Sequence, residues 1–419
     1  MISASLLRKH GFCVHIIDGR VDPRWLIKVK TIQSDYDWIA LTSSPLDRWQ
    51  CPNLEIGHFI KIARKLPSEK LIIMGAHGSL APEAILRKTD ARAVIVGEPE
   101  RTLLNLLSQN AWDKTAGLVF RRNKEIVSTG TAELADLAEW PLPAFDLVDF
   151  SRYQYELLGR RFALFEGSRG CPYQCRYCLK VMYGEGVRFK PIPQMVEEVG
   201  HAVHKFGVRC GYFFDLEFTI HRSRIMQFCD QLIYQKYPFI WCCQTRPDAV
   251  DIELLSKMKQ AGCRLIHYGI ETGNQQLLND INKKVNLDTI QASIKMTREA
   301  GIDSACFFLF GFPGETKKNM LQTIALAKTL NPTYASFHTV TPYPGTSIYA
   351  QCARAGSKLE KNLYYPQTCP EHDPRLLDAI VKKALRSFYL RPGYVIDRLR
   401  KGNLRSWLGQ IRLFKEFMT

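Results

Sequence analysis

The chain has 419 residues, of which 46% are hydrophobic and 23% are charged, and its formal net charge is +16. The length predicts two or three domains and the composition predicts globular domains with large cores. No run of eighteen uncharged apolar residues occurs and residues 1–18 do not resemble a secretory signal, so we expect neither a membrane-spanning helix nor export. Thirteen cysteines, an odd number, argue against a disulfide framework and for a reducing, cytoplasmic setting.

The first hundred residues alternate β-rich runs with amphipathic segments such as "LEIGHFIKIARKL". The β-rich runs are residues 14–18, 38–43, 70–75 and 93–97. This alternation predicts an α/β fold with a parallel sheet covered on both faces, which is a doubly wound domain. Such sheets bind ligands beyond the carboxyl ends of their strands, so "TSS", "GAHGS" and "GEPE" are the expected binding loops. The alternative is that their glycines only form tight turns.

The order of elements at the start of the chain is unusual for a doubly wound domain. A helical segment comes first and a run that reads as the second strand follows at once, so we expect the domain to lack its first strand. A hairpin with a polar turn is predicted over 117–130, and a linker with prolines follows it. The expected organisation is a domain over 1–130, a linker over 131–153, a second domain over 154–345 and a helical extension over 346–419.

The second domain contains six further β-rich runs, separated by helical stretches of which three end at or next to glycine. The runs are residues 162–168, 210–215, 239–245, 264–270, 302–310 and 334–340. Six consecutive βα units predict an open, partial (β/α)6 barrel. Its active site is expected at the carboxyl ends of the strands.

Three cysteines, Cys171, Cys175 and Cys178, follow the first of these strands in "SRGCPYQCRYC". No second cysteine pair lies near enough in the sequence to complete a structural zinc site. Three thiolates can hold three corners of a [4Fe–4S] cluster and leave the fourth iron open to a substrate or cofactor. The alternative is a set of three buried or zinc-binding cysteines.

The segment "GCPYQCRYC", with Tyr177 before its third cysteine, resembles the radical S-adenosylmethionine (SAM) enzymes. The segments "HYGIETGNQQLLNDINKKV", "FLFGFPGET" and "TPYPGTSIY" resemble the subfamily that joins a flavodoxin-like, cobalamin-binding domain to a radical SAM barrel. The resemblance implies that SAM binds the open iron and that an electron from the cluster cleaves it to a 5′-deoxyadenosyl radical, which abstracts hydrogen from the substrate. It also implies cobalamin held without a protein histidine.

Polar residues at the strand ends are the expected cofactor contacts. Asp215 and Glu217 would accept hydrogen bonds from the SAM ammonium group, Arg246 would pair with the SAM carboxylate, and Glu271 would bind the ribose hydroxyls. For each, a structural ion pair between neighbouring loops is the alternative. The expected SAM contacts are Tyr177, Asp215, Glu217, Arg246 and Glu271. The expected cobalamin contacts are Thr42, Ser43, Gly75, Gly78, Gly97 and Glu98. No catalytic residue is identified.

The basic charge is concentrated at the C-terminus, where residues 381–419 hold ten Lys or Arg and two acids. Basic and large apolar residues alternate there at helical spacing. We expect helices that pack on the barrel with a solvated basic face, and the alternative is contact with an anionic membrane surface. The spacing matches no nucleic-acid-binding module, so no nucleic-acid partner is expected.

The function that we predict is cobalamin-dependent methyl transfer to an unactivated carbon or phosphorus of an unidentified small molecule. Reducing equivalents would come from a partner such as flavodoxin or ferredoxin. Two alternatives stay open: a radical cyclase or rearrangement enzyme of tetrapyrrole or lipid metabolism, and a non-catalytic regulator that binds an iron–sulfur cluster or cobalamin.

Overall fold

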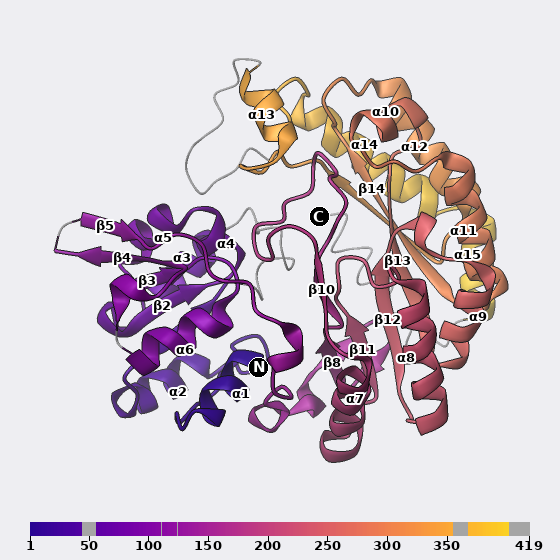
Figure 1. The fold of residues 1–419 in the computed structure, drawn as a ribbon. Coiled ribbons are helices and arrows are strands. Elements are labelled where there is room, and N and C mark those ends of the chain that lie inside the picture. Colours follow the sequence, from indigo (N-terminus) through magenta and orange to yellow (C-terminus); the bar gives the residue numbers. More distant parts are fainter. Residues whose placement is uncertain (44–55, 110, 124, 355–367, 402–419) are drawn as a thin grey trace.

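The structure is a computed structural model that describes residues 1–43, 56–109, 111–123, 125–354 and 368–401. The described residues contain a five-stranded sheet near the N-terminus and a six-stranded sheet in the rest of the chain. Figure 1 shows them side by side, with the first sheet and its helices at the left and the second, curved sheet at the right.

The N-terminal sheet has the order β1-β2-β3-β4-β5. Its strands are β1 (Ile39–Thr42), β2 (Leu71–Met74), β3 (Ala93–Ile95), β4 (Leu118–Arg122) and β5 (Glu125–Ser128). The first three are parallel, while β4 and β5 form an antiparallel hairpin. These strands confirm three of the four predicted β-rich runs and the hairpin.

The prediction of a strand over residues 14–18 is wrong, because this segment joins no sheet. Phe12 and Val14 instead pack against the core on the side of the sheet that α1 covers. Burial of these side chains therefore outweighs the β propensity of the segment.

Helices cover both faces of the N-terminal sheet, as expected for a doubly wound domain. On one face lie α1 (Ile2–Lys9) and α6 (Pro99–Gln109), and on the other α3 (Gly57–Ala63) and α5 (Pro82–Thr89). Successive residues of β2 alternate between the two cores, Ile72 in one and Ile73 in the other. The remaining helices of this region are α2 (Trp25–Ile32) and α4 (Ala76–Leu80).

The second sheet consists of six parallel strands in the order β15-β14-β13-β12-β11-β8, which follows the chain. The strands are β8 (Phe162–Phe165), β11 (Cys210–Phe213), β12 (Ile240–Thr245), β13 (Cys263–Glu271), β14 (Asp303–Phe310) and β15 (Tyr334–Thr339). All six predicted β-rich runs of this region are strands. The sheet is open, because β8 and β15 lie at its two edges.

Helices between the strands cover the outer face of this sheet (Figure 1). They are α7 (Ile192–Phe206), α8 (Arg222–Gln235), α9 (Ile252–Gln260), α10 (Gln275–Asp280), α11 (Leu287–Glu299) and α12 (Lys317–Leu330). The outward residues Phe213, Trp241 and Phe308 are fully buried in the core between sheet and helices. A short hairpin of β6 (Gln154–Tyr155) and β7 (Gly159–Arg160) packs by Tyr155 against inward residues.

Three C-terminal helices follow the sheet: α13 (Ser347–Arg354), α14 (Pro374–Tyr389) and α15 (Pro392–Lys401). The apolar side of α14, with Leu377 and Phe388, is buried in the core of the six-stranded sheet. The Tyr389 hydroxyl accepts from the Ala335 backbone N–H at 3.0 Å and donates to its carbonyl at 2.8 Å, which caps the edge strand β15. The expected packing on the barrel is therefore confirmed for α14.

The structure gives no support for membrane contact by the C-terminal extension. Among the described residues, no helix is both long and apolar enough to cross a bilayer. The end of the predicted tail, residues 402–419, lies outside the described residues.

Candidate active site

The three cysteines lie in a loop that a short ladder closes. After β8 the chain forms β9 (Ser168–Gly170), which pairs antiparallel with β10 (Val187–Phe189), so residues 171–186 form the cysteine loop. Gly170 has a φ of +93°, and a Cβ at this position would overlap the Gly186 carbonyl oxygen. Only glycine lets the two strands meet directly before Cys171.

The cysteine loop folds back on itself around its thiols. Lys180 Nζ donates to the carbonyls of Cys171 at 3.2 Å and Tyr173 at 2.8 Å, and the Cys178 backbone N–H donates to the Cys175 carbonyl at 3.1 Å. Cys171 is buried, Cys175 and Cys178 are half-buried, and none of the three is in a disulfide bond. Burial raises the pKa of Cys171 and of Cys175.

The donor set of the cysteine loop is three thiols on one short segment. In a cubane each thiolate binds a different iron, so three cysteines hold three corners of the cluster. Cys171, Cys175 and Cys178 fit such a cluster by their chemistry and by their place on one loop. Within the described parts of the chain, no group of three or more His, Cys, Asp or Glu is arranged to hold one metal ion.

Arg246 follows β12 and lies directly over the cysteine loop. It is 1% exposed, and its guanidinium carbon is 3.9 Å from the centre of the Tyr173 ring. Nε and Nη2 donate to Asp248, both at 2.8 Å, and Nη2 also donates to the Lys283 carbonyl at 2.6 Å. Nη1 is buried and has no partner among the described residues. Nη1 is therefore the guanidinium nitrogen left for an acidic ligand. The edge formed by Nε and Nη2 is already bound to Asp248.

Glu217 lies beside Arg246, whereas Asp215 ties two strand ends together. Glu217 Oε2 accepts from the Arg246 backbone N–H at 2.7 Å, and burial raises its pKa to about 7. Asp215 accepts from the Gly167 backbone N–H at 2.9 Å and from Ser168 Oγ at 2.5 Å, and burial raises its pKa to about 6. These contacts are hydrogen bonds to a neighbouring strand end and not the ion pair of the alternative, and the contact of Asp215 with SAM stays a prediction.

Glu271, at the end of β13, shares a contact with Tyr177, because Lys283 lies beside both side chains. Lys283 Nζ is 2.9 Å from Glu271 Oε1 and 3.4 Å from the Tyr177 hydroxyl. Burial alone would lower the pKa of Lys283, but Glu271, Cys175 and Glu217 together outweigh burial and the pKa is raised. Sequence reasoning missed Lys283, because nothing in "NKKV" separates this buried lysine from its exposed neighbour Lys284.

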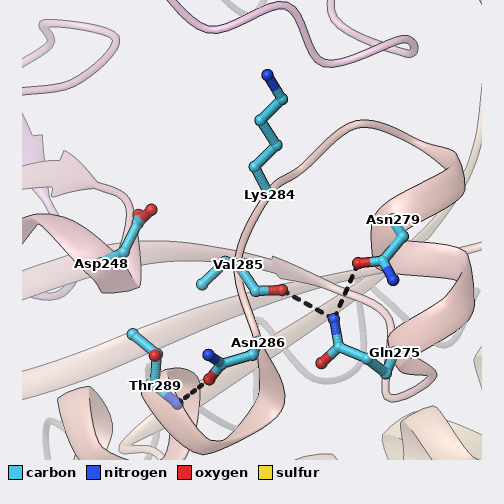
Figure 2. A pocket seen from close by; sticks show the side chains of 7 residues that line it. All are labelled: Asp248, Gln275, Asn279, Lys284, Val285, Asn286 and Thr289. Carbon is cyan, nitrogen blue, oxygen red and sulfur yellow. Dashed lines mark hydrogen bonds between the residues drawn. The ribbon is translucent and has the colours of Figure 1, made fainter.

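A shallow depression of about 300 Å³ lies on the far side of the Lys283 segment (Figure 2). It is lined by Asp248, Gln275, Asn279, Lys284, Val285, Asn286 and Thr289. Figure 2 shows Lys284 pointing away from the hydrogen-bonded pair of Gln275 and Asn279. None of the predicted SAM contacts lines this depression.

The three loops predicted to hold cobalamin follow β1, β2 and β3 at one edge of the N-terminal sheet. Gly75 has a φ of 106° and Gly97 a φ of 82°, so both need glycine for their backbone conformation. A Cβ at Gly78 would come within 2.9 Å of Val94 Cγ1, so this glycine permits close packing of α4 on β3. Ser43 donates from its backbone N–H to the Met74 carbonyl at 3.0 Å. Thr42 ends β1, and the residues that follow Ser43 lie outside the described ranges.

These N-terminal loops contact the end of the cysteine loop. Ser79 Oγ lies 3.2 Å from Met182 Sδ and accepts from the Gly97 backbone N–H at 2.9 Å. A group bound at these loops would therefore adjoin Met182. The glycine backbones and the position of the loops at one strand edge fit a planar cofactor between the two sheets.

Glu98, a predicted cobalamin contact, pairs with arginines at the base of the cysteine loop. It accepts from Arg169 Nη1 at 2.9 Å and from Arg188. Glu100 accepts from Arg169 Nη2 at 2.7 Å and Glu166 accepts from its Nε at 2.9 Å. Sequence reasoning missed these partners, because the pairing joins residues about 70 positions apart.

In this fold, a loop with three cysteines lies at the carboxyl ends of the strands of an open parallel sheet. That combination defines a class of proteins. Residues 165–327 match the radical SAM superfamily. The part of the chain that carries the cysteine loop and most of the six-stranded sheet is therefore similar to this superfamily.

Two relatives match most of the chain. An uncharacterized methyltransferase of Pyrococcus horikoshii is 26% identical over 96% of this chain and 92% of its own length. The anaerobic magnesium-protoporphyrin IX monomethyl ester cyclase of Cereibacter sphaeroides is 28% identical over 82% of this chain. The chain spans 58% of the length of this cyclase.

Two solved structures share the fold. The radical SAM methyltransferase TsrM of Kitasatospora setae, with cobalamin and a [4Fe–4S] cluster bound, superposes with a TM-score of 0.68 at 18% identity, covering 84% of this chain and 71% of its own. The cobalamin-dependent SAM radical enzyme OxsB superposes with a TM-score of 0.64 at 18% identity. The match covers 96% of this chain and 58% of the OxsB chain. The chain therefore has the fold of radical SAM enzymes with an added N-terminal α/β domain.

Proposed function

We propose that this protein is a radical SAM enzyme that transfers a methyl group to an unactivated carbon or phosphorus with the help of cobalamin. Cys171, Cys175 and Cys178 would hold a [4Fe–4S] cluster. The observation that carries the proposal is the buried, unpartnered Nη1 of Arg246 over the cysteine loop. A buried donor without a partner is costly, so a carboxylate such as that of SAM would satisfy it.

The residues around this donor would bind and orient SAM. Tyr177 and Phe312 pack edge to face at 5.7 Å and form an apolar wall beside the cysteines. Glu217, whose pKa burial raises to about 7, would accept from the SAM ammonium group once that charge lies beside it. Glu271 would bind the ribose while Lys283 holds its carboxylate in place. When bound, the cluster and cobalamin would supply electron transfer and the methyl carrier.

The loops after β1, β2 and β3 would hold cobalamin between the two sheets. Gly75 and Gly97 offer backbone without side chains at the edge that meets Met182. The structural neighbour TsrM carries cobalamin and the neighbour OxsB carries aqua-cobalamin, which supports the assignment by shared fold. Glu98 is left out of this set because arginines hold its carboxylate.

The proposal is tested by anaerobic reconstitution of the full chain. We expect about four iron and four sulfide per chain, conversion of SAM to 5′-deoxyadenosine after reduction with dithionite or with flavodoxin, and retention of hydroxocobalamin on gel filtration. A reconstituted chain that leaves SAM intact under reducing conditions would refute the enzymatic proposal. Turnover of SAM without cobalamin retention would refute its cobalamin part alone.

A second candidate function is radical cyclisation or rearrangement. Anaerobic magnesium-protoporphyrin IX monomethyl ester cyclases match 82%, 83% and 69% of this chain, a coverage comparable to that of the methyltransferases. The two candidates differ in the fate of the SAM methyl group. With methyl-labelled SAM, a methyltransferase puts the label into product, whereas a cyclase does not.

A further inference from the structure

Two arginines face each other at the base of the cysteine loop. Arg169 on β9 and Arg188 on β10 are direct partners in the antiparallel ladder that closes the loop. Like charges at opposed positions destabilise such a ladder. The ladder has only three residue pairs, so its stability depends on groups that neutralise the two guanidiniums.

Carboxylates from the N-terminal domain supply most of that neutralisation. Glu98 accepts from both arginines, and Glu100 accepts from Arg169 at 2.7 and 3.1 Å. Glu166 of the second domain accepts from Arg169 Nε. Two of the three carboxylates that meet the arginines therefore come from the segment after β3, Glu98 from the loop and Glu100 from the first turn of α6. We call these five residues the charge clamp.

The side chains of the charge clamp are mostly buried. The side chains of Arg169, Glu98, Glu100 and Glu166 are all at least nine-tenths buried, and that of Arg188 is 22% exposed. Burial alone would raise the pKa of Glu100, but the Arg169 guanidinium outweighs it and the pKa is lowered. Removal of one of the buried carboxylates therefore takes a hydrogen-bond acceptor away from a buried guanidinium.

We propose that Glu98 and Glu100 are positioning residues for the cysteine loop, so that the N-terminal domain completes the site that the second domain carries. They act through Arg169 and Arg188, which close the β9–β10 ladder two residues before Cys171. The proposal rests on the proposed function, since it assumes that the loop holds a cluster. It assigns to the GEPE loop a task in building the iron–sulfur site.

The test uses the full chain, cluster-free and reduced, and measures alkylation of Cys171 by iodoacetamide with mass spectrometry. Cys171 is 8% exposed and reports opening of the loop, while the exposed Cys13 gives the reference rate. Glu98→Gln is expected to speed Cys171 alkylation about tenfold relative to Cys13, as typical coupling between two sites would give. The same variant is expected to take up less iron on reconstitution.

Glu198→Gln is the matched control. Glu198 on α7 forms an equally buried ion pair, at 2.7 Å, with Lys190, the residue directly after β10. Both residues of this pair belong to the second domain. It should leave Cys171 alkylation at the wild-type rate. If Glu98→Gln leaves the rate unchanged, or if Glu198→Gln raises it as much, the proposal is overturned, because the effect would not belong to the charge clamp.

Arg188→Gln gives a second route if Glu98→Gln fails to fold, since Arg188 is the most exposed member of the clamp. Arg169→Lys should lie between wild type and Glu98→Gln, because lysine keeps the charge but not the three-sided guanidinium. If the wild-type chain takes up no cluster at all, the proposed function fails. The alkylation rates are measured without a cluster, so they still decide the proposal about the clamp.

Discussion

The buried pair of Lys283 and Glu271 makes the sharpest stability prediction for the candidate site. Its atoms Nζ and Oε1 are 2.9 Å apart, and its side chains are 6% and 8% exposed. At an effective dielectric of about 20, the Coulomb attraction at this distance is about 6 kcal/mol, part of which offsets the cost of burying both ions. Lys283→Met leaves Glu271 buried without its partner. We expect a loss of about 3–5 kcal/mol in the free energy of unfolding of the cluster-free chain.

Urea unfolding followed by circular dichroism at pH 7 measures this loss. Lys284→Met is the matched control, because the neighbouring lysine is exposed and points away from the Gln275–Asn279 pair (Figure 2); it should cost less than about 0.5 kcal/mol. Adding Glu271→Gln to Lys283→Met should restore about 1–3 kcal/mol, since the unpaired charge is then gone. Equal losses for Lys283→Met and Lys284→Met would refute the reasoning that burial governs the cost.

Three further predictions concern other parts of the structure. Burial raises the pKa of Asp215 to about 6 from its ordinary value near 3.8. The contribution of this carboxyl group to the free energy of unfolding is therefore complete below about pH 4 and is lost as the pH rises through 6. Urea titrations across this range should show that Asp215→Asn flattens the decline by about 2–3 kcal/mol. Gly170→Ala should sharply lower iron uptake on reconstitution, whereas Gly130→Ala, with a similar φ of +85° but open space around it, should not. Tyr389→Phe should cost about 1–2 kcal/mol in the free energy of unfolding by uncapping β15, whereas Tyr234→Phe, 82% exposed, should cost nothing measurable.

Much of the fold could be predicted because the strands of a parallel sheet are short, continuous and apolar. Five of the six strands of the second sheet fall within their predicted runs, β13 extends one residue beyond its run at each end, and the cysteine loop follows the first strand. The prediction of a strand over residues 14–18 was wrong for a different reason. It has the composition of a strand, but α1 and the sheet core offer its apolar side chains a place to pack without a ladder partner.

The candidate site was harder to predict than the fold, because its residues are joined by long-range contacts. The residue types at the strand ends suggested Arg246, Glu217 and Glu271, and the structure brings them near the cysteine loop. Lys283 carries no comparable signal, since it lies in a connection between two helices and becomes part of the site only when that connection folds over β13. Its role follows from burial, which the sequence alone does not reveal.

Glu98 shows why the position of a loop does not by itself assign the role of its residues. The loop after β3 lies where a doubly wound sheet binds ligands, and Gly97 has the backbone that such a loop needs. The adjacent carboxylate nevertheless points to Arg169 and Arg188, whose burial would be costly without it. One loop thus offers glycine backbone toward a cofactor and carboxylates toward the base of the cysteine loop. A shift of this loop on cofactor binding would therefore move both the proposed cobalamin contacts and the base of the cysteine loop.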